Sequence, residues 1–448
     1  MLQCLAQPAP VPQAIPSKIG FWRKPNYSVK LPFSTPVRSM EKSFKLPDYQ
    51  GRSIANIPAT VAGLFEAPFV GLPALADELW EPLLASGNVR HIVLLLIDGM
   101  GLNLIRAAGD DAGWLPAEAT VRGELTSVFP STTVAALSSL WTGVAPAQHG
   151  LLGLKMFFSQ FATMGHMLQF SPSFAPFPDA LVEAGLDPET FLPAPGLAQQ
   201  LARAGVRTYS LKHYGLVESA LSKMHNRGVA RGIGTVTAAD TMWWIRHTLE
   251  TDPHERNCLI AYWAAVDSLQ HVHGPGHPAV MAELYSVLHL VRRELLHALS
   301  AEARRGAVLL VTADHGQIQT PVEQRIFLED HPQLQELLLM QPAGEPRTVY
   351  LYARQGCSDD VVAYLREYLP QAAVATPAQQ ALDEGWFGPH PYAEQTALRV
   401  GDVVVTMREG YALTTRDEAR FVQQMGGRHG GLSPQEMSVP WYAFRLDA

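Results

Sequence analysis

The strongest constraint on the fold of this chain is a set of three long apolar segments that each end at an aspartate. They are HIVLLLID (91–98), CLIAYWAAVD (258–267) and AVLLVTAD (307–314). Segments this apolar have no polar face to turn toward water, and strands of this kind are buried on both faces of a parallel sheet covered by helices. We therefore predict an α/β fold with a mostly parallel central sheet flanked by helices.

The intervening segments fit this alternation of strands and helices. Helices are expected at 132–141, 237–250 and 278–303, and a further strand is expected at 207–212. A hydrophobic content of 47% supplies enough apolar material for a large buried sheet, and this composition excludes wholesale disorder.

The chain divides into a short extension and one large domain. Residues 1–39 are rich in proline and show no helical or strand period, which predicts a flexible N-terminal extension, and Met40 is an alternative start of translation. We assign residues 40–448 to the large domain. It has a loop-rich insertion at 155–197, dense in Phe, Met and Pro, and a small α/β insertion at about 321–400.

The charge balance limits the partners that the protein can bind. Lys plus Arg is 34 and Asp plus Glu is 42, which gives a net charge of −8, and the basic residues form no cluster. A nucleic-acid polymer is therefore not an expected partner. An anionic small molecule remains compatible, because bound divalent cations reverse the local field.

Cysteine use and the N-terminus indicate the compartment. The three cysteines, Cys4, Cys258 and Cys357, are too widely spaced for a disulfide framework or a thiolate zinc site, which favours a reducing compartment. The N-terminus lacks the pattern of a secretory signal, and no apolar run approaches the ~20 residues that span a bilayer. We expect a soluble, cytoplasmic protein that does not enter a membrane.

Asp98, Asp267 and His271 are candidate metal ligands close to two of the apolar segments. Asp98 leaves its strand into the glycine-rich turn DGMG, although an aspartate in a turn is also an ordinary structural feature. Asp267 and His271 are four residues apart, a spacing that places both on one face of a helix. Two nearby histidines, His273 and His277, are alternatives to His271.

Two further segments carry candidate ligands. Asp314 and His315 end the third strand in TADHG, the most specific local signal in the chain. His429 lies in GGRHGG, where the flanking glycines are typical of a loop that delivers a ligand.

Thr133 is a candidate nucleophile in the segment PSTTVAALSSL. Pro130 and Ser131 predict a helix start, so Thr133 lies in the first turn, where free backbone N–H groups favour an anion. Thr132 is the local competitor, and either threonine could instead be a helix cap. Metal coordination is one way to activate such a hydroxyl.

The positions of the candidate ligands relative to the predicted strands favour a shared site. Asp98, Asp267 and Asp314 each close or follow an apolar strand, and the carboxyl ends of parallel strands meet at one sheet edge. Carboxylates crowded there would repel one another, and divalent cations remove that repulsion. We predict a metal site.

These motifs resemble the alkaline phosphatase superfamily, and within it the type I phosphodiesterase/nucleotide pyrophosphatase family. The family's metal-binding aspartate in a D-G turn matches Asp98, and its F-P-S/T-x-T stretch matches FPSTT and selects Thr133. Its D-x-x-x-H pair matches Asp267 and His271. Its D-H-G segment matches Asp314 and His315, and its late His-Gly matches His429, so the motifs keep the family order along the chain.

The resemblance implies an alkaline phosphatase-like catalytic domain with two divalent metal ions, of the zinc type, with manganese or iron as alternatives. One ion would be held by Asp98, Thr133, Asp314 and His315, and the other by the remaining three ligands. Thr133 would attack the phosphorus in line to give a phospho- or nucleotidyl-threonine, which water activated at the second metal would then release.

The resemblance leaves the substrate open. Nucleotide pyrophosphatases of the family carry a downstream asparagine that contacts a non-bridging phosphate oxygen, and Leu154 stands at the matching position here. Lys155 is the nearest polar replacement, and Phe157 and Phe158 are candidates for contact with a base or an apolar leaving group. Each of these phenylalanines could instead pack the insertion against the core.

The expected function is hydrolysis of a phosphodiester or a nucleotide-type phosphoanhydride in a small phosphorylated substrate. A phosphonate hydrolase and a phosphomutase of the same superfamily are the alternatives. A non-catalytic binding protein is disfavoured because every ligand position is filled. A homodimer is possible, although no segment specifies one.

Overall fold

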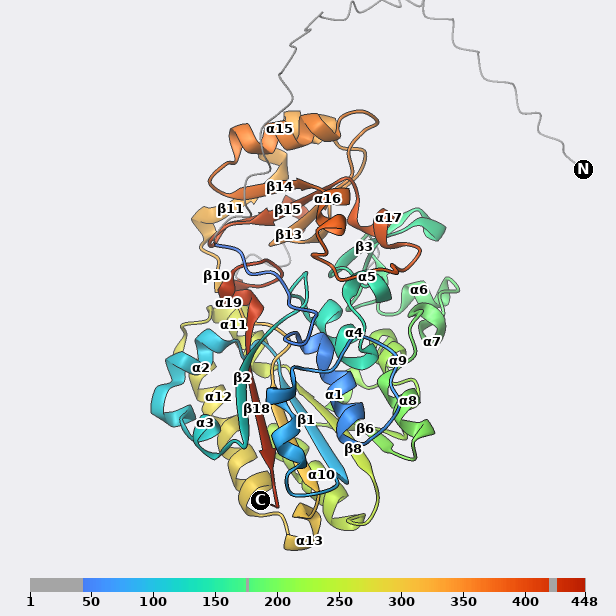
Figure 1. The fold of residues 1–448 in the computed structure, drawn as a ribbon. Helices are drawn as coiled ribbons and strands as arrows, with labels where there is room; N and C mark the ends of the chain where they lie inside the picture. Colours follow the sequence, from blue (N-terminus) through green and yellow to red (C-terminus); the bar gives the residue numbers. More distant parts are fainter. Residues whose placement is uncertain (1–42, 175–176, 419–424, 448) are drawn as a thin grey trace, which may run out of the picture. The chain divides into compact units, whose positions relative to one another are not determined.

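The computed structural model describes residues 43–174, 177–418 and 425–447, and the extension predicted at 1–39 lies outside these ranges. Its centre is a seven-stranded sheet with the order β2-β18-β9-β1-β8-β6-β7 (Figure 1). β18 alone runs opposite to the other six strands, so the prediction of a mostly parallel sheet is confirmed. The strands are β1 (His91–Ile97), β2 (Val121–Thr126), β6 (Arg207–His213), β7 (Arg231–Thr235), β8 (Asn257–Trp263), β9 (Ala307–Thr312) and β18 (Ser438–Arg445).

The strand register places three site segments at one edge of this sheet. Every residue of β1 is buried, as the sequence HIVLLLI requires of a central strand. Leu96 of β1 pairs with Tyr262 of β8 on one side and with Thr312 of β9 on the other. The chain therefore leaves all three strands at the same level, just before Asp98, Asp267 and Asp314.

Helices cover both faces of the central sheet. Figure 1 shows α2, α3 and α12 on one side of the sheet and α1, α4 and α8 on the other. Their bounds are α1 (Ile57–Leu64), α2 (Leu102–Ala108), α3 (Trp114–Glu118), α4 (Thr133–Thr142), α8 (Leu197–Arg203) and α12 (Pro278–Leu290). The helix predicted at 237–250 is present as α10 (Ala238–Thr251).

Two predicted elements are shorter than expected. The strand predicted at 258–267 ends at Trp263, and Asp267 lies in the first turn of the following helix α11 (Ala265–His273). The helix predicted at 278–303 ends as a π-helical segment, Val291–His297, and the chain restarts as α13 (Ala301–Arg304). Ser300 accounts for this break, because its side chain accepts a hydrogen bond from the Ala303 N–H as an N-cap.

A second seven-stranded sheet has the order β14-β15-β13-β12-β3-β4-β5. It draws on both segments predicted as insertions and also on β15, which lies beyond the predicted end of the second one at about residue 400. The segment 155–197, expected to be loop-like, contains three short strands. A pairing between Gly344 and Lys155 joins it to the segment 321–400. The strands are β3 (Lys155–Phe158), β4 (Thr163–His166), β5 (Ser171–Pro172), β12 (Ala343–Glu345), β13 (Thr348–Leu351), β14 (Ala373–Pro377) and β15 (Val403–Met407).

This sheet arrangement leads us to propose that the two insertions form one unit beside the catalytic core. The helix α15 (Ser358–Tyr368) lies within the segment predicted as a small α/β insertion and packs against β14. In the described ranges, no helix combines the length and the apolarity that a membrane crossing needs.

A fully buried ion pair ties the second sheet to the last helix of the chain, α19 (Pro434–Met437). The guanidinium of Arg347 donates to both oxygens of the Glu436 carboxylate, at 3.0 Å from Nε and 2.8 Å from Nη2. The same carboxylate accepts hydrogen bonds from the Gly431 N–H at 2.9 Å and from the Ser433 hydroxyl at 2.6 Å. The pair therefore holds the loop that follows His429.

Replacing Arg347 by Met should lower the free energy of unfolding by about 3–5 kcal/mol, because it leaves the Glu436 carboxylate buried without its cation. Urea unfolding followed by circular dichroism would measure the change. The matched control is Arg416→Ala at the exposed pair with Asp330, which should change stability by less than about 1 kcal/mol. Equal effects of the two substitutions would contradict this account of the buried pair.

Candidate metal centre

Asp98, Asp314 and His315 form the first of two clusters of potential metal ligands, and all three are buried. The His315 Nε2 atom lies 3.5 Å from Asp98 Oδ1 and 3.4 Å from Asp314 Oδ2. Both of these carboxylate oxygens are buried without a hydrogen-bond partner among the described residues. Two unpaired carboxylate oxygens and the His315 Nε2 atom, whose hydrogen-bond contact is the Thr133 hydroxyl, therefore converge on one point.

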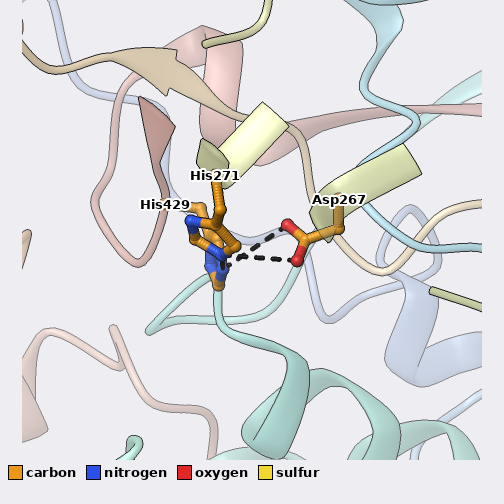
Figure 2. A group of neighbouring side chains, drawn as sticks. All are labelled: Asp267, His271 and His429. Atoms are coloured by element: carbon orange, nitrogen blue, oxygen red, sulfur yellow. Dashed lines mark hydrogen bonds and ion pairs between the residues drawn. The ribbon is translucent and has the colours of Figure 1, made fainter. Parts of the chain in front are cut away.

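Asp267, His271 and His429 form the second cluster, which Figure 2 shows. The His271 Nε2 atom lies 3.3 Å from Asp267 Oδ2 and 3.2 Å from His429 Nε2. Asp267 and His271 project from one face of α11, as their spacing predicted. His429 is delivered by the loop after β17 (Gly427–Arg428), which pairs with β10 (Ile318–Gln319).

Backbone carbonyl groups orient all three imidazoles. Each Nδ1 atom is hydrogen-bonded to a carbonyl oxygen: His271 to Gly427 at 2.9 Å, His429 to Ser131 at 2.9 Å, and His315 to Gly316 at 3.1 Å. A carbonyl can only accept, so each Nδ1 carries the proton. Each Nε2 lone pair therefore faces the cluster, as in metal-ligating histidines.

The alternatives His273 and His277 lie outside both clusters. Their rings stack on each other with centroids 4.4 Å apart, and the Nδ1 of His277 accepts a hydrogen bond from the Ala279 N–H at the start of α12. His277 is therefore a helix cap, one of the ordinary structural uses of such a residue.

The two clusters adjoin, and Thr133 lies beside the first. The rings of His315 and His429 stack with centroids 3.6 Å apart. Thr133 opens α4, and its hydroxyl lies 3.1 Å from His315 Nε2. Thr132 is the N-cap residue, but its buried hydroxyl does not cap the helix and instead hydrogen-bonds Glu345. The geometry thus favours Thr133 over Thr132 as the hydroxyl at the centre.

The electrostatics of the described residues call for a cation. Burial raises the pKa of Asp98 well above its ordinary value, and the charges of Asp314 and Asp267 raise it further. Burial lowers the pKa of His429 well below its ordinary value, reinforced by His315 and His271. The surroundings therefore favour neutral imidazoles but destabilise neighbouring ionised carboxylates, and a bound cation would compensate for that repulsion.

Comparison with known proteins assigns the family. The model of the type I phosphodiesterase / nucleotide pyrophosphatase family matches residues 92–432, which include every predicted ligand. The chain belongs to this family. Members hydrolyse phosphate esters, so the protein is a phosphoester hydrolase of the alkaline phosphatase superfamily.

Solved structures agree with this fold. Murine ectonucleotide pyrophosphatase / phosphodiesterase 5 is 17% identical with a TM-score of 0.58, and the match covers 79% of this chain and 87% of the murine one. Phosphonoacetate hydrolase from Sinorhizobium meliloti 1021 is 20% identical with a TM-score of 0.56, and the match covers 78% and 89% of the two chains. No curated protein matches the sequence significantly.

The predicted substrate-binding residues lie in different surroundings from the metal ligands. Lys155 forms an ion pair with Glu418. Phe157 is half-buried against Tyr352, with ring centroids 6.0 Å apart. Phe158 is fully buried in a core cluster, where its ring packs against Phe191 and others. Phe158 thus packs in the core in this structure, and substrate contact by Lys155, Phe157 and Phe158 stays a prediction.

Two polar residues that the sequence analysis missed contact the predicted ligands. The Tyr262 hydroxyl donates to Asp98, and the Gln317 amide donates to Asp267. Neither residue belongs to a recognisable motif, and Tyr262 is part of an apolar strand sequence. The available signal was their position along the chain, because Tyr262 is the second-to-last residue of β8 and Gln317 follows the segment TADHG.

Chelating the metal should destabilise the protein more at pH 8 than at pH 5. The folded-state pKa of Asp98 is raised, so without a cation the stability present at low pH is lost as the pH rises through that pKa. A cation binds the ionised carboxylates and restores stability where they are charged. Thermal unfolding with zinc or with a chelator, at both pH values, measures the difference. An equal effect of the chelator at both values would contradict the prediction.

Proposed function

We propose that the protein hydrolyses a phosphodiester, a nucleotide-type phosphoanhydride or a related phosphonate with two divalent cations and Thr133 as the nucleophile. The observation that carries this proposal is the position of the Thr133 hydroxyl. It lies 3.1 Å from His315 Nε2, whose cluster adjoins the second one. The same cluster contains two carboxylate oxygens that have no hydrogen-bond partner among the residues of the structure described above.

The residues of each cluster would hold one cation. Asp98, Asp314 and His315, with the Thr133 hydroxyl, would hold the first, and Asp267, His271 and His429 the second. When bound, the two cations would supply Lewis-acid stabilisation for the attacking and leaving oxygens and lower the pKa of a hydroxyl or a water. The oxygen and nitrogen donors suit zinc, and manganese or iron are alternatives.

Thr133 would act by nucleophilic substitution at phosphorus. Its Oγ loses a proton and forms a bond to phosphorus as the bond to the leaving oxygen, or to the leaving carbon of a phosphonate, breaks. The free backbone N–H groups at the start of α4 favour the anionic phosphoryl group, because the Thr132 side chain does not occupy them. Water then cleaves the phosphothreonine and regenerates the hydroxyl.

Relatives support this role for a threonine and for small phosphorylated ligands. The murine relative was crystallised with AMP as an inactive threonine-to-alanine variant. The Sinorhizobium meliloti enzyme was crystallised with phosphonoacetate and with phosphonoformate. These two ligand classes match the nucleotide and phosphonate readings of this site.

The residue at position 154 bears on the choice between these classes. Leu154 has no side-chain donor, and its backbone N–H points to the Glu345 carboxyl instead. A phosphoryl oxygen would therefore depend on the cations and the α4 N-terminus for its stabilisation. We propose Lys155 and Phe157 as contacts for the more distant part of the substrate, with Phe158 supporting Phe157 from the core.

Thr133→Ala should lower the turnover of bis-p-nitrophenyl phosphate by on the order of 10³-fold or more, because it removes the attacking oxygen. Metal content, measured by elemental analysis, should be largely retained because the six Asp and His ligands remain. Thr132→Ser is the matched control, since it keeps the hydroxyl that contacts Glu345, and its turnover should stay close to that of the parent. Full activity of Thr133→Ala would rule out this nucleophile.

A substrate panel separates the subclasses that this site could serve. Activity would be measured on p-nitrophenyl phosphate, bis-p-nitrophenyl phosphate, ATP and phosphonoacetate, each with added zinc or manganese. A preference for the diester or ATP supports the phosphodiesterase reading, and a preference for phosphonoacetate supports the phosphonate reading. Undiminished activity after thorough chelation would contradict the two-cation mechanism.

A further inference from the structure

Tyr262 contacts the first ligand cluster through its hydroxyl. It lies on β8 beside Leu96 of β1, and its phenol donates a hydrogen bond to Asp98 Oδ2. The other carboxylate oxygen, Oδ1, has no hydrogen-bond partner in the described part of the chain and is the oxygen that lies 3.5 Å from His315 Nε2. The phenol therefore uses one oxygen of Asp98 and leaves the other for a cation.

The backbone beside Asp98 reinforces this orientation. The Asp98 N–H donates to the carbonyl oxygen of Trp263 at 2.9 Å, so β8 holds both the backbone and the side chain of Asp98. The carboxylate is only 2% exposed, which leaves little room for water to replace the phenol. Removing the hydroxyl would leave the carboxylate free to rotate.

Gln317 makes the corresponding contact in the second cluster. Its side-chain amide donates to Asp267 Oδ1, while Asp267 Oδ2 lies 3.3 Å from His271 Nε2. The same amide nitrogen lies 3.3 Å from the Asp267 carbonyl oxygen. Gln317 is 1% exposed, and an added Cβ at Gly427 would lie 2.5 Å from its Oε1 atom. Gly427 thus leaves the space that Gln317 occupies.

We infer that Tyr262 and Gln317 are positioning residues that each serve one cation, Tyr262 at the Asp98 cluster and Gln317 at the Asp267 cluster. Both donors are neutral, so they orient a carboxylate without cancelling the charge that attracts the cation. A lysine or an arginine in the same place would also orient the carboxylate, but its positive charge would cancel the negative charge that attracts the cation. This inference rests on the two-cation centre proposed above.

The two contacts are separate, so their effects on metal affinity should separate as well. Loss of an outer hydrogen-bond donor to a metal ligand typically weakens metal binding by about 10–100-fold. Tyr262→Phe removes the donor to Asp98 alone, and Gln317→Met removes the donor to Asp267 alone at similar volume. A merely structural role would instead weaken both sites together and lower the stability of the metal-free protein.

Single-site backgrounds of the full-length protein make the test direct. His271→Ala disables the second cluster, and zinc affinity of the remaining site would be measured by competition with a chromophoric chelator. We expect Tyr262→Phe to weaken zinc binding about 10–100-fold in this background, with Gln317→Met unchanged within about 2-fold. The His315→Ala background should give the reverse pattern.

Three controls distinguish a specific effect on zinc binding from a general loss of structure. Tyr209→Phe, at a half-buried tyrosine on the neighbouring strand β6, should change neither affinity. Thermal unfolding of the metal-free variants should match that of their parents. Turnover of Tyr262→Phe with both clusters intact should recover as zinc is raised.

Two results would overturn the inference while leaving the proposed function in place. The first is that the parent binds zinc and that neither Tyr262→Phe nor Gln317→Met changes the zinc affinity. The second is that one of these variants weakens zinc binding equally at both sites. A parent protein that binds neither zinc nor manganese would instead remove the two-cation centre itself.

Discussion

The arrangement of this protein depends on the burial of three carboxylates at one edge of a parallel sheet. Asp98, Asp267 and Asp314 are each less than 10% exposed, and burial, followed by the charges of Asp314 and Asp267, raises the pKa of Asp98. When these carboxylates are ionised, positive charge nearby offsets their repulsion. The surrounding donors do not meet that need, because those in contact with the carboxylates are neutral groups such as the Tyr262 hydroxyl and the Gln317 amide. The divalent cations proposed above would meet it, and the imidazole nitrogens that converge on the same points are suitable ligands for them.

The loops that carry the proposed nucleophile, Thr133, and the last candidate ligand, His429, are connected to each other as well as to the sheet. The Ser131 carbonyl accepts from His429 Nδ1, and the Ser131 hydroxyl donates to the Gly431 carbonyl oxygen at 2.7 Å. Glu345 lies between the same two loops, with Thr132 on one side and Gly430 on the other. A positive φ of 114° and the proximity of the Glu345 carboxylate, 2.5 Å from an added Cβ, both explain why position 430 is glycine. The start of α4 and the His429 loop are thereby held in one geometry.

Most of the core was predictable because the apolar composition of its strands indicates that both of their faces are buried. The segments 91–98 and 307–314 are apolar on both faces, and each proved to be a central strand that ends just before its aspartate. The prediction was wrong where apolar composition continued past the strand. Ala264–Val266 is as apolar as the strand before it, yet the chain turns into α11 there, which places Asp267 on the same helix as His271. Local composition does not distinguish a buried strand from a buried helix start.

The sequence by itself determined the ligand types, their order along the chain and the α/β class, because apolar periodicity and the spacing of Asp and His are local properties. Only the tertiary structure decided which carboxylate oxygens have no hydrogen-bond partner among the described residues, and that Tyr262 and Gln317 each contact one candidate ligand carboxylate. It also decided that the two segments predicted as insertions contribute strands to a single sheet. It also placed Lys155 in an ion pair with Glu418, a residue far along the chain. Contacts of this kind join segments far apart in sequence, and they depend on strand register and loop closure, which no single segment specifies.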